Sequence, residues 1–227
     1  MVKNEYSIND IDQLVDRIIC LCGSKPKDER LIIGIAGVPG SGKTTLSTKL
    51  SEQLNQQKYP TINLPQDGFH SYRSELISMP NSEEAVRRRG APFTFNASKF
   101  LQLVKSLKSP QLRDRDLYAP SFDHSIKDPV ENDIKISKDT DIIILEGNYL
   151  ALKDEVWCEL ANYMDEIWFL ETNFEVTRKR LIKRHLQAGI ARTESEAIDR
   201  ADNNDLVNGQ YIIDNSICPD VTIITPV

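Results

Sequence analysis

Short apolar runs, bounded by polar residues, divide the chain at five places. They span residues 31–36, 60–66, 141–147, 166–170 and 221–225. Continuous apolar runs of this length are typical of strands that are buried on both faces of a parallel sheet. Parallel neighbours need crossover connections, which are usually helical and right-handed. We therefore predict an α/β fold, a three-layer sandwich in which helices cover both faces of a five-stranded parallel sheet.

The segments between these runs place apolar residues three or four positions apart, as amphipathic helices do. Phe100, Leu101, Val104 and Leu107, for example, fall on one face of a helix. Ser7 precedes a similar stripe and is a residue type preferred at helix N-caps. The predicted helices cover 7–22, 45–54, 96–107, 152–164 and a stretch from 173 onward, with a shorter one from 82 toward Gly90.

The composition is that of a single globular domain, which we predict to span 1–227. Of the 227 residues, 40% are hydrophobic and 27% are charged, which is ordinary for such a domain. The net charge of −6 argues against binding to a nucleic-acid backbone, which needs an electropositive face.

Targeting signals and disulfide signals are weak in this sequence. No apolar run approaches the roughly 20 residues that cross a bilayer. The polar N-terminus, Met1–Tyr6, matches no signal-peptide pattern, and the four cysteines show no metal-binding spacing. We therefore expect a cytoplasmic protein that has neither nucleic acid nor membrane as a partner.

The stretch Gly37–Thr44 fits the pattern G-x-x-x-x-G-K-[ST] at every fixed position. It lies between a predicted strand and a predicted helix, which is the context that a P-loop needs. Such a turn points backbone N–H groups at phosphate oxygens, and the start of the helix adds positive dipole character. The alternative is a glycine turn that only joins strand to helix. The full match in context favours a nucleoside triphosphate site.

In a P-loop, Lys43 reaches the β- and γ-phosphates and the Thr44 hydroxyl ligates Mg²⁺. We therefore expect ATP and Mg²⁺ as cofactors. The residues that we assign to the nucleotide in this loop are Gly37, Val38, Pro39, Gly40, Ser41, Gly42, Lys43, Thr44 and Thr45.

Two acidic residues stand at the ends of predicted strands. Asp67 follows 60–66, and Glu146 lies at the end of 141–147. In open parallel sheets, ligands bind outside the carboxyl ends of the strands, so both carboxylates are expected beside the phosphates. We predict that Asp67 is the general base and that Glu146 holds a Mg²⁺-bound water or contacts the attacking hydroxyl. The alternative for Glu146 is an ordinary strand-end acid.

Residues 71–135 interrupt the alternation of strand and helix. From Ser109 to Ser137 the chain is rich in Pro, Asp and Ser. A connection of this length inside a compact domain is usually functional. We therefore predict that 71–135 is an inserted region that binds the acceptor substrate.

Five basic residues lie within 178–184 of an otherwise acidic chain. A charge run usually means a solvated helix face. Its late position and the turn at Gly189 instead favour a lid, which we place at 178–193. Arg178 and Arg184 are the predicted phosphate contacts, because arginine stays charged and pairs bidentately with phosphate.

A second basic group, Arg87–Gly90, has two interpretations. Its arginines, Arg88 among them, bind an anionic acceptor or the transferred phosphoryl group, or else they complement the dipole of a helix C-terminus. His70 and His124 are expected to make hydrogen bonds to the substrate, because no second ligand sits at metal spacing from either. The aromatic residues around them wall a pocket or form the core of the inserted region.

Four landmarks occur along the chain in the order GVPGSGKTT, QDGFH, RRRGAPFTF and ILEGNYL. With these residues the chain resembles the phosphoribulokinase/uridine kinase superfamily of P-loop kinases, which also contains bacterial-type pantothenate kinase. The stretches YAPSFDHSIKDP and KRHLQAGIARTESEA, followed by NDLVNG, look most like small fungal and bacterial kinase-like ATPases. The resemblance covers roughly residues 30–215.

The resemblance implies that Asp67 activates the acceptor hydroxyl and that Glu146 is the second acidic residue of the site. Lys43 and Thr44 then serve ATP and Mg²⁺, and Gln66 departs from the apolar residue that often precedes DGFH, with no catalytic consequence expected. The resemblance also implies lid and substrate-side positions, which are Arg178, Arg184, Asp123 and His124.

Two functions fit these residues. One is an ATP-dependent kinase, uridine kinase-like or pantothenate kinase-like, that transfers the γ-phosphate to a hydroxyl of a small metabolite. The alternative is a regulatory ATPase without a metabolite acceptor. Dimerisation is common in the superfamily, so a homodimer is compatible with either function.

Overall fold

Strand β2, which leads into the P-loop, lies inside a parallel sheet. The computed structural model describes residues 4–226, so Met1–Lys3 of the N-terminus considered above lie outside it. The sheet has six strands in the order β1-β8-β7-β2-β6-β3, and every neighbouring pair is parallel. The strand bounds are β1 Glu5–Ser7, β2 Leu31–Gly37, β3 Thr61–Pro65, β6 Ile142–Gly147, β7 Glu166–Glu171 and β8 Val221–Ile224.

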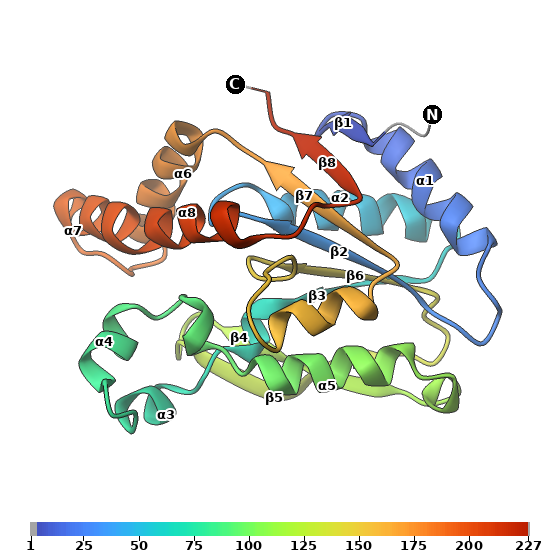
Figure 1. The fold of residues 1–227 in the computed structure, drawn as a ribbon, viewed down its shortest axis with the longest axis horizontal. Helices are drawn as coiled ribbons and strands as arrows, with labels where there is room; N and C mark the ends of the chain where they lie inside the picture. The colour runs from blue at the N-terminus through green and yellow to red at the C-terminus, as the bar shows by residue number, and fades with distance from the viewer. Residues whose placement is uncertain (1–3, 227) are drawn as a thin grey trace.

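Helices cover both faces of this sheet, which confirms the three-layer α/β prediction (Figure 1). On one face, α1 (Ile11–Gly23) and α2 (Lys43–Gln56) bury Leu14, Ile18 and Leu50 against the strands. On the other face, α5 (Ala97–Lys108) buries all four apolar residues of its predicted stripe. A short 3₁₀ segment, η4 (Trp157–Asn162), packs beside α5 on this side.

The remaining helices lie toward the end of the sheet where the P-loop emerges (Figure 1). Helix α6 spans Phe174–Gln187 and α7 spans Glu194–Arg200. A π-helical segment, η5 (Ala201–Asp205), continues from α7 into α8 (Leu206–Asn215). Helix α6 contacts both α7 and η5, so these elements form one group beside the P-loop.

Three predictions about single elements were wrong: the start of the first helix, the number of strands and the helix at 152–164. The first helix begins at Ile11 with Asp10 as its N-cap, whereas Ser7 belongs to β1, which pairs with β8 and makes the sheet six-stranded. A three-residue strand is too short to show a period of its own, so the helical stripe that follows it dominates the pattern. The segment 152–164 is irregular apart from η4.

The inserted region 71–135 contains more regular structure than its composition predicts. It holds α3 (Arg73–Ile77), α4 (Ser82–Arg87), η2 (Pro92–Thr94), α5 and η3 (Pro110–Leu112). The long connection after α5 folds into an antiparallel hairpin of β4 (Leu117–Asp123) and β5 (Asp128–Ile136). This hairpin forms a second sheet that packs on η1 (Gln66–Phe69), directly after β3.

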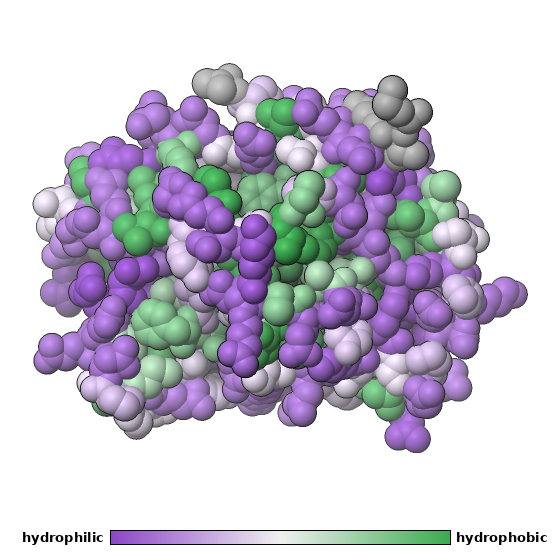
Figure 2. Space-filling model, viewed as in Figure 1, coloured by the Kyte–Doolittle hydropathy of each residue, from purple (hydrophilic) through white to green (hydrophobic). Residues whose placement is uncertain are grey.

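Hydrophilic side chains cover most of the face shown in Figure 2, and apolar side chains appear mainly near its middle, between α8 and α5. No helix among residues 4–226 is both long enough and apolar enough to span a bilayer.

The contact between η1 and β4 depends on the absence of a side chain at Gly68. A Cβ at this position would lie 2.1 Å from the backbone oxygen of Pro120. We predict that Gly68→Ala lowers the free energy of unfolding by about 2 kcal/mol or more, because the rigid β4 backbone must move. Denaturant unfolding followed by circular dichroism measures this change.

The matched control is Gly23→Ala, at the end of α1, where a Cβ meets no atom within 4 Å. It should leave the stability within about 1 kcal/mol of that of the wild type. Equal effects of the two substitutions would contradict the proposed η1–β4 contact.

Candidate active site

Three strands deliver the predicted catalytic groups to one edge of the sheet. β2 runs between β6 and β7, and β6 runs between β2 and β3. In register, Glu146 of β6 lies opposite Ile35 of β2 and Pro65 of β3. The P-loop after β2, the segment η1 after β3 and residues 146–149 therefore meet at the carboxyl ends of adjacent strands, where α/β proteins bind ligands.

The P-loop backbone has the conformation that its glycines allow. Gly40 and Gly42 have φ angles of 77° and 105°, which side chains rarely permit. Gly42 is the N-cap of α2, and Leu46 N donates to its carbonyl oxygen. The turn thus ends at the N-terminus of a helix of 14 residues, where free N–H groups and the helix dipole favour phosphate.

Lys43 is buried inside this loop, with 8% of its surface exposed. Its Nζ donates to the carbonyl oxygens of Gly37 and Val38, each at 2.9 Å, and to Asn148 Oδ1 at 2.8 Å. Burial lowers the pKa of this lysine to about 8, against the opposing effect of Glu146 and Asp67. The ammonium therefore loses solvation at this position and would gain from contact with phosphate.

Thr44 and Glu146 form the second polar contact of the site. Thr44 Oγ1 lies 2.9 Å from each carboxylate oxygen of Glu146. Desolvation raises the pKa of Glu146, while the Thr44 hydrogen bond and Lys43 oppose the shift. A hydroxyl and a carboxylate side by side are hard oxygen ligands of the kind that Mg²⁺ prefers.

Magnesium sites in kinases need few protein ligands, because water and phosphate oxygens complete the octahedron. Within residues 4–226 there is no group of three or more His, Cys, Asp or Glu side chains that could hold a metal by themselves. Thr44 and Glu146, with Asp67 nearby, fit a Mg²⁺ ion that arrives with the nucleotide.

Asp67 lies in η1 at the same edge, and its side chain is exposed. Its charge acts on Lys43, Glu146 and His70, so its carboxylate lies near the P-loop and the end of β6. Its carbonyl oxygen accepts a hydrogen bond from His70 N at 3.2 Å and lies 2.8 Å from His70 Nδ1. An exposed carboxylate beside the P-loop lysine is accessible to a substrate hydroxyl.

Gln66, which departs from the family pattern, is almost fully buried and has a structural partner. Its Oε1 accepts a hydrogen bond from Tyr149 N at 3.0 Å. A Cβ at Gly147 would lie 2.1 Å from the same oxygen, so the glycine of ILEGNYL makes room for Gln66. Tyr149 Oη in turn donates to the carbonyl oxygen of Gly90, which connects this edge to the arginine segment.

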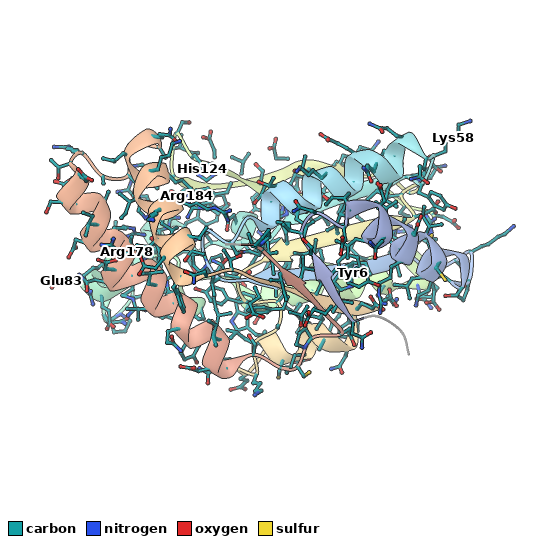
Figure 3. The ribbon with its side chains drawn as sticks, turned by 90° about the horizontal axis from the view of Figure 1, so that it is seen from above. Tyr6, Lys58, Glu83, His124, Arg178 and Arg184 are labelled. Carbon is teal, nitrogen blue, oxygen red and sulfur yellow. The ribbon has the colours of Figure 1, made fainter. Side chains whose placement is uncertain are left out.

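The arginines predicted to belong to a lid lie on α6, where Figure 3 labels Arg178 and Arg184. Arg178 forms an ion pair with Asp202 of η5, with Nε 2.6 Å from Oδ1. Arg184 is exposed, and its charge helps to lower the pKa of Lys43. Arg180, which we did not single out, donates to the carbonyl oxygen of Ser41 at 3.0 Å. Thus Arg180 contacts the P-loop and Arg184 lies near it, whereas Arg178 is held by Asp202.

The three consecutive arginines have distinct surroundings. Arg87 is exposed at the end of α4. Arg89 forms an ion pair with Asp128 at 2.8 Å and donates to the carbonyl oxygen of Ser71. Arg88 is half-buried and donates to two side-chain amides, those of Asn204 in η5 and Asn208 in α8.

The substrate-side candidates lie around the hairpin. His70 stacks on Phe95 and Phe122, with ring centroids 3.9 and 4.9 Å away, and desolvation lowers its pKa. His124 is exposed at the tip of the hairpin, next to Phe122. Asp123 accepts hydrogen bonds from Ser125, which hold its pKa below the usual range. The structure thus brings His70 to the site and leaves Asp123 and His124 at its outer rim.

Residues 32–195 match the phosphoribulokinase/uridine kinase family. The chain belongs to this family. A Schizosaccharomyces pombe protein named "Putative uridine kinase C227.14" is 39% identical over 218 residues, which cover 95% of this chain and 91% of that protein. The Aspergillus versicolor protein named "ATP-dependent kinase-like protein notR'" is 42% identical over 66% of this chain and 88% of its own length.

Solved structures agree with this membership. The crystal structure of a "putative fructose transport system kinase" from Silicibacter sp. TM1040 superposes with a TM-score of 0.83 and 28% identity. The superposition covers 93% of this chain and 98% of the Silicibacter chain. The family, the P-loop and these neighbours confirm the fold and the resemblance, and they support a P-loop kinase that binds ATP.

The lowered pKa of Lys43 generates a prediction about ATP binding by this family member. With a pKa of about 8, Lys43 is only partly protonated at pH 8. Bound phosphate raises this pKa, so the lysine takes up protons from solution. ATP binding should therefore take up about half a proton at pH 8. Calorimetric titration in buffers of different ionisation enthalpy measures this uptake.

The comparison variant is Lys43→Met, which keeps the length of the side chain and removes its titration. Uptake should disappear in this variant, provided that it still binds ATP at the concentrations used. The same uptake in both proteins would show that another group titrates.

Proposed function

We propose that this protein is an ATP-dependent kinase that transfers the γ-phosphoryl group to a hydroxyl of a small metabolite. The observation that carries the proposal is the exposed Asp67 carboxylate, which lies beside the P-loop lysine and Glu146. A P-loop that only hydrolysed ATP would need a positioned water, and it would not need a separate region to shape an acceptor pocket.

In this proposal Asp67 accepts the proton of the acceptor hydroxyl as the hydroxyl oxygen attacks the γ-phosphorus, the bond from that phosphorus to the β,γ-bridging oxygen breaks, and ADP leaves. Lys43 and the N-terminus of α2 stabilise negative charge on the phosphates, and Arg184 adds a positive charge from the lid. Thr44 and Glu146 would hold Mg²⁺, which would supply positive charge for the phosphates when it is bound. The catalytic groups come from strand ends, so their positions are fixed by the sheet.

The acceptor-binding region is proposed to be 71–135, and the lid is proposed to be 178–193. A cavity of about 400 Å³ opens within the inserted region, lined in part by Ser71, Phe93 and Phe95. Phe95 also stacks on His70, which follows Asp67 by three residues. The cavity is thus connected to the proposed base through two aromatic rings, which suits a small organic acceptor.

The test is an ADP-release assay over a panel of hydroxyl compounds, with uridine, cytidine, pantothenate, D-glycerate and D-fructose among them. A kinase shows ATP consumption that one acceptor stimulates strongly, and the phosphoryl group appears on that acceptor. Steady hydrolysis that no compound stimulates would support an ATPase and overturn the proposal.

Replacement of Asp67 tests its proposed role as general base directly. Asp67→Asn preserves shape and removes the proton acceptor, so kcat should fall by roughly 10²-fold or more. ATP binding, measured by titration with a non-hydrolysable analogue, should stay within about threefold of wild type, because the P-loop is unchanged.

The control for this variant is Asp16→Asn, the same substitution on the exposed side of α1. It should leave kcat and analogue binding unchanged. A wild-type kcat in Asp67→Asn would rule out the assignment of Asp67 as general base.

A further inference from the structure

Arg88 has surroundings that differ from those of the other arginines near the site. Its Nε donates to Asn204 Oδ1 at 3.0 Å, and its Nη2 donates to Asn208 Oδ1 at 2.7 Å. Both partners are neutral amides, and no carboxylate among residues 4–226 forms an ion pair with Arg88. The guanidinium is therefore fixed in orientation without a carboxylate in direct contact.

The neighbouring arginines lack this combination. Arg89 is neutralised by Asp128, and Arg178 is neutralised by Asp202. Arg87 is exposed at the end of α4. A half-buried cation without a counter-ion is costly to maintain, and such a cost is typical of a group that meets an anion during function.

Asn208 adds a second donor at the same place. The residue has only 1% of its surface exposed, and its Nδ2 is buried without a hydrogen-bond partner. Its Oδ1 is already committed to Arg88. An unpaired amide N–H group beside a guanidinium that no carboxylate contacts makes a pair of donors that suits an oxyanion.

This pair of donors lies near the P-loop on one side and near the inserted region on the other. Gly209, next to Asn208, packs on the P-loop, where a Cβ would lie 3.5 Å from Val38 Cβ. Tyr149, whose hydroxyl donates to the Gly90 carbonyl, is influenced by the charges of Asp205, Arg88 and Asp67. Arg88 itself belongs to the inserted region, so it approaches from the acceptor side.

We propose that the acceptor carries an oxyanion, a carboxylate or a phosphate, in addition to its reacting hydroxyl, and that Arg88 receives this group. Asn204 and Asn208 are the positioning residues that hold Arg88, and Asn208 Nδ2 is a second donor to the same oxyanion. The proposal rests on the kinase function proposed above and assigns the substrate class. It disfavours a neutral nucleoside or a neutral sugar as the acceptor.

The test compares two charge classes of acceptor in the ADP-release assay. D-Glycerate, pantothenate and glycerol 3-phosphate form the anionic arm, which separates carboxylate from phosphate. Uridine, cytidine and D-fructose form the neutral arm. We expect stimulation by a member of the anionic arm.

The decisive variant is Asn208→Asp, which places a carboxylate of the same size 2.7 Å from Arg88 Nη2. This carboxylate neutralises the guanidinium and repels the substrate anion, so KM for the anionic acceptor should rise at least tenfold, while ATP binding is retained. Asn204→Asp, which faces Nε, should act in the same direction and serves if Asn208→Asp does not fold. The control is Asn203→Asp, an exposed position next to Asn204, which should leave KM unchanged.

Each result supports or overturns a distinct statement. Stimulation by a neutral acceptor, with none by the anionic arm, overturns the substrate class and leaves the kinase function intact. Anionic stimulation with an unchanged KM in both folded variants overturns the role of Arg88. A loss of kcat at unchanged KM assigns Arg88 to the transferred phosphoryl group and overturns the acceptor contact. No stimulation in either arm overturns the proposed function together with the inference.

Discussion

The buried ammonium of Lys43 is the interaction around which the site is built. Three oxygens within 2.9 Å hold it, two from the P-loop and one from Asn148 at the end of β6. This geometry requires β2 and β6 to be parallel neighbours and requires the glycine turn to wrap the side chain. Burial removes water from the Lys43 ammonium and lowers its pKa. Contact with negatively charged phosphate replaces the lost solvation, and this gain favours phosphate binding.

The π-helical segment η5 connects α6 to the inserted region. Asp202 pairs with Arg178 of α6, and Asn204 holds Arg88 of the inserted region. Asp205 lies 2.6 Å from His185, which is buried in α6. Three residues of one short segment thus contact three side chains from two regions of the chain. π-Helical segments are rare overall and occur frequently at functional sites, so η5 is a candidate functional element between α6 and the inserted region.

The placement of Lys43 and Glu146 at one edge of the sheet could be predicted, because strand ends and the P-loop pattern determine it. Glu146 and Lys43 follow from a strand–loop–helix signal and from the rule that ligands bind at carboxyl ends of parallel strands. Asn148 and Asn208 could not be found in this way, because a single asparagine has no spacing pattern and its role depends on the tertiary partner. Arg178 was favoured over Arg180 for the same reason, since sequence alone does not show which face of α6 meets Asp202.

The region between α5 and β6 shows where composition misleads. Pro, Asp and Ser between 109 and 137 suggest an irregular connection, yet the segment forms the β4–β5 hairpin that packs on η1. The hairpin is stabilised by its contact with the glycine of QDGFH, which lies about fifty residues earlier in the chain. Long-range packing of this kind carries no local periodicity. The three-residue strand β1 was missed because pairing with β8, and not a pattern of its own, defines it.

A crystal structure with Mg²⁺ and a non-hydrolysable ATP analogue tests the central claim most directly. The account predicts that Lys43 Nζ leaves the carbonyl oxygens of Gly37 and Val38 and contacts the β- and γ-phosphates. Thr44 and Glu146 should then lie next to the Mg²⁺ ion, and the Asp67 carboxylate should face the γ-phosphorus. Triphosphate bound elsewhere, or Lys43 still bonded to the P-loop carbonyls with the nucleotide present, would contradict it.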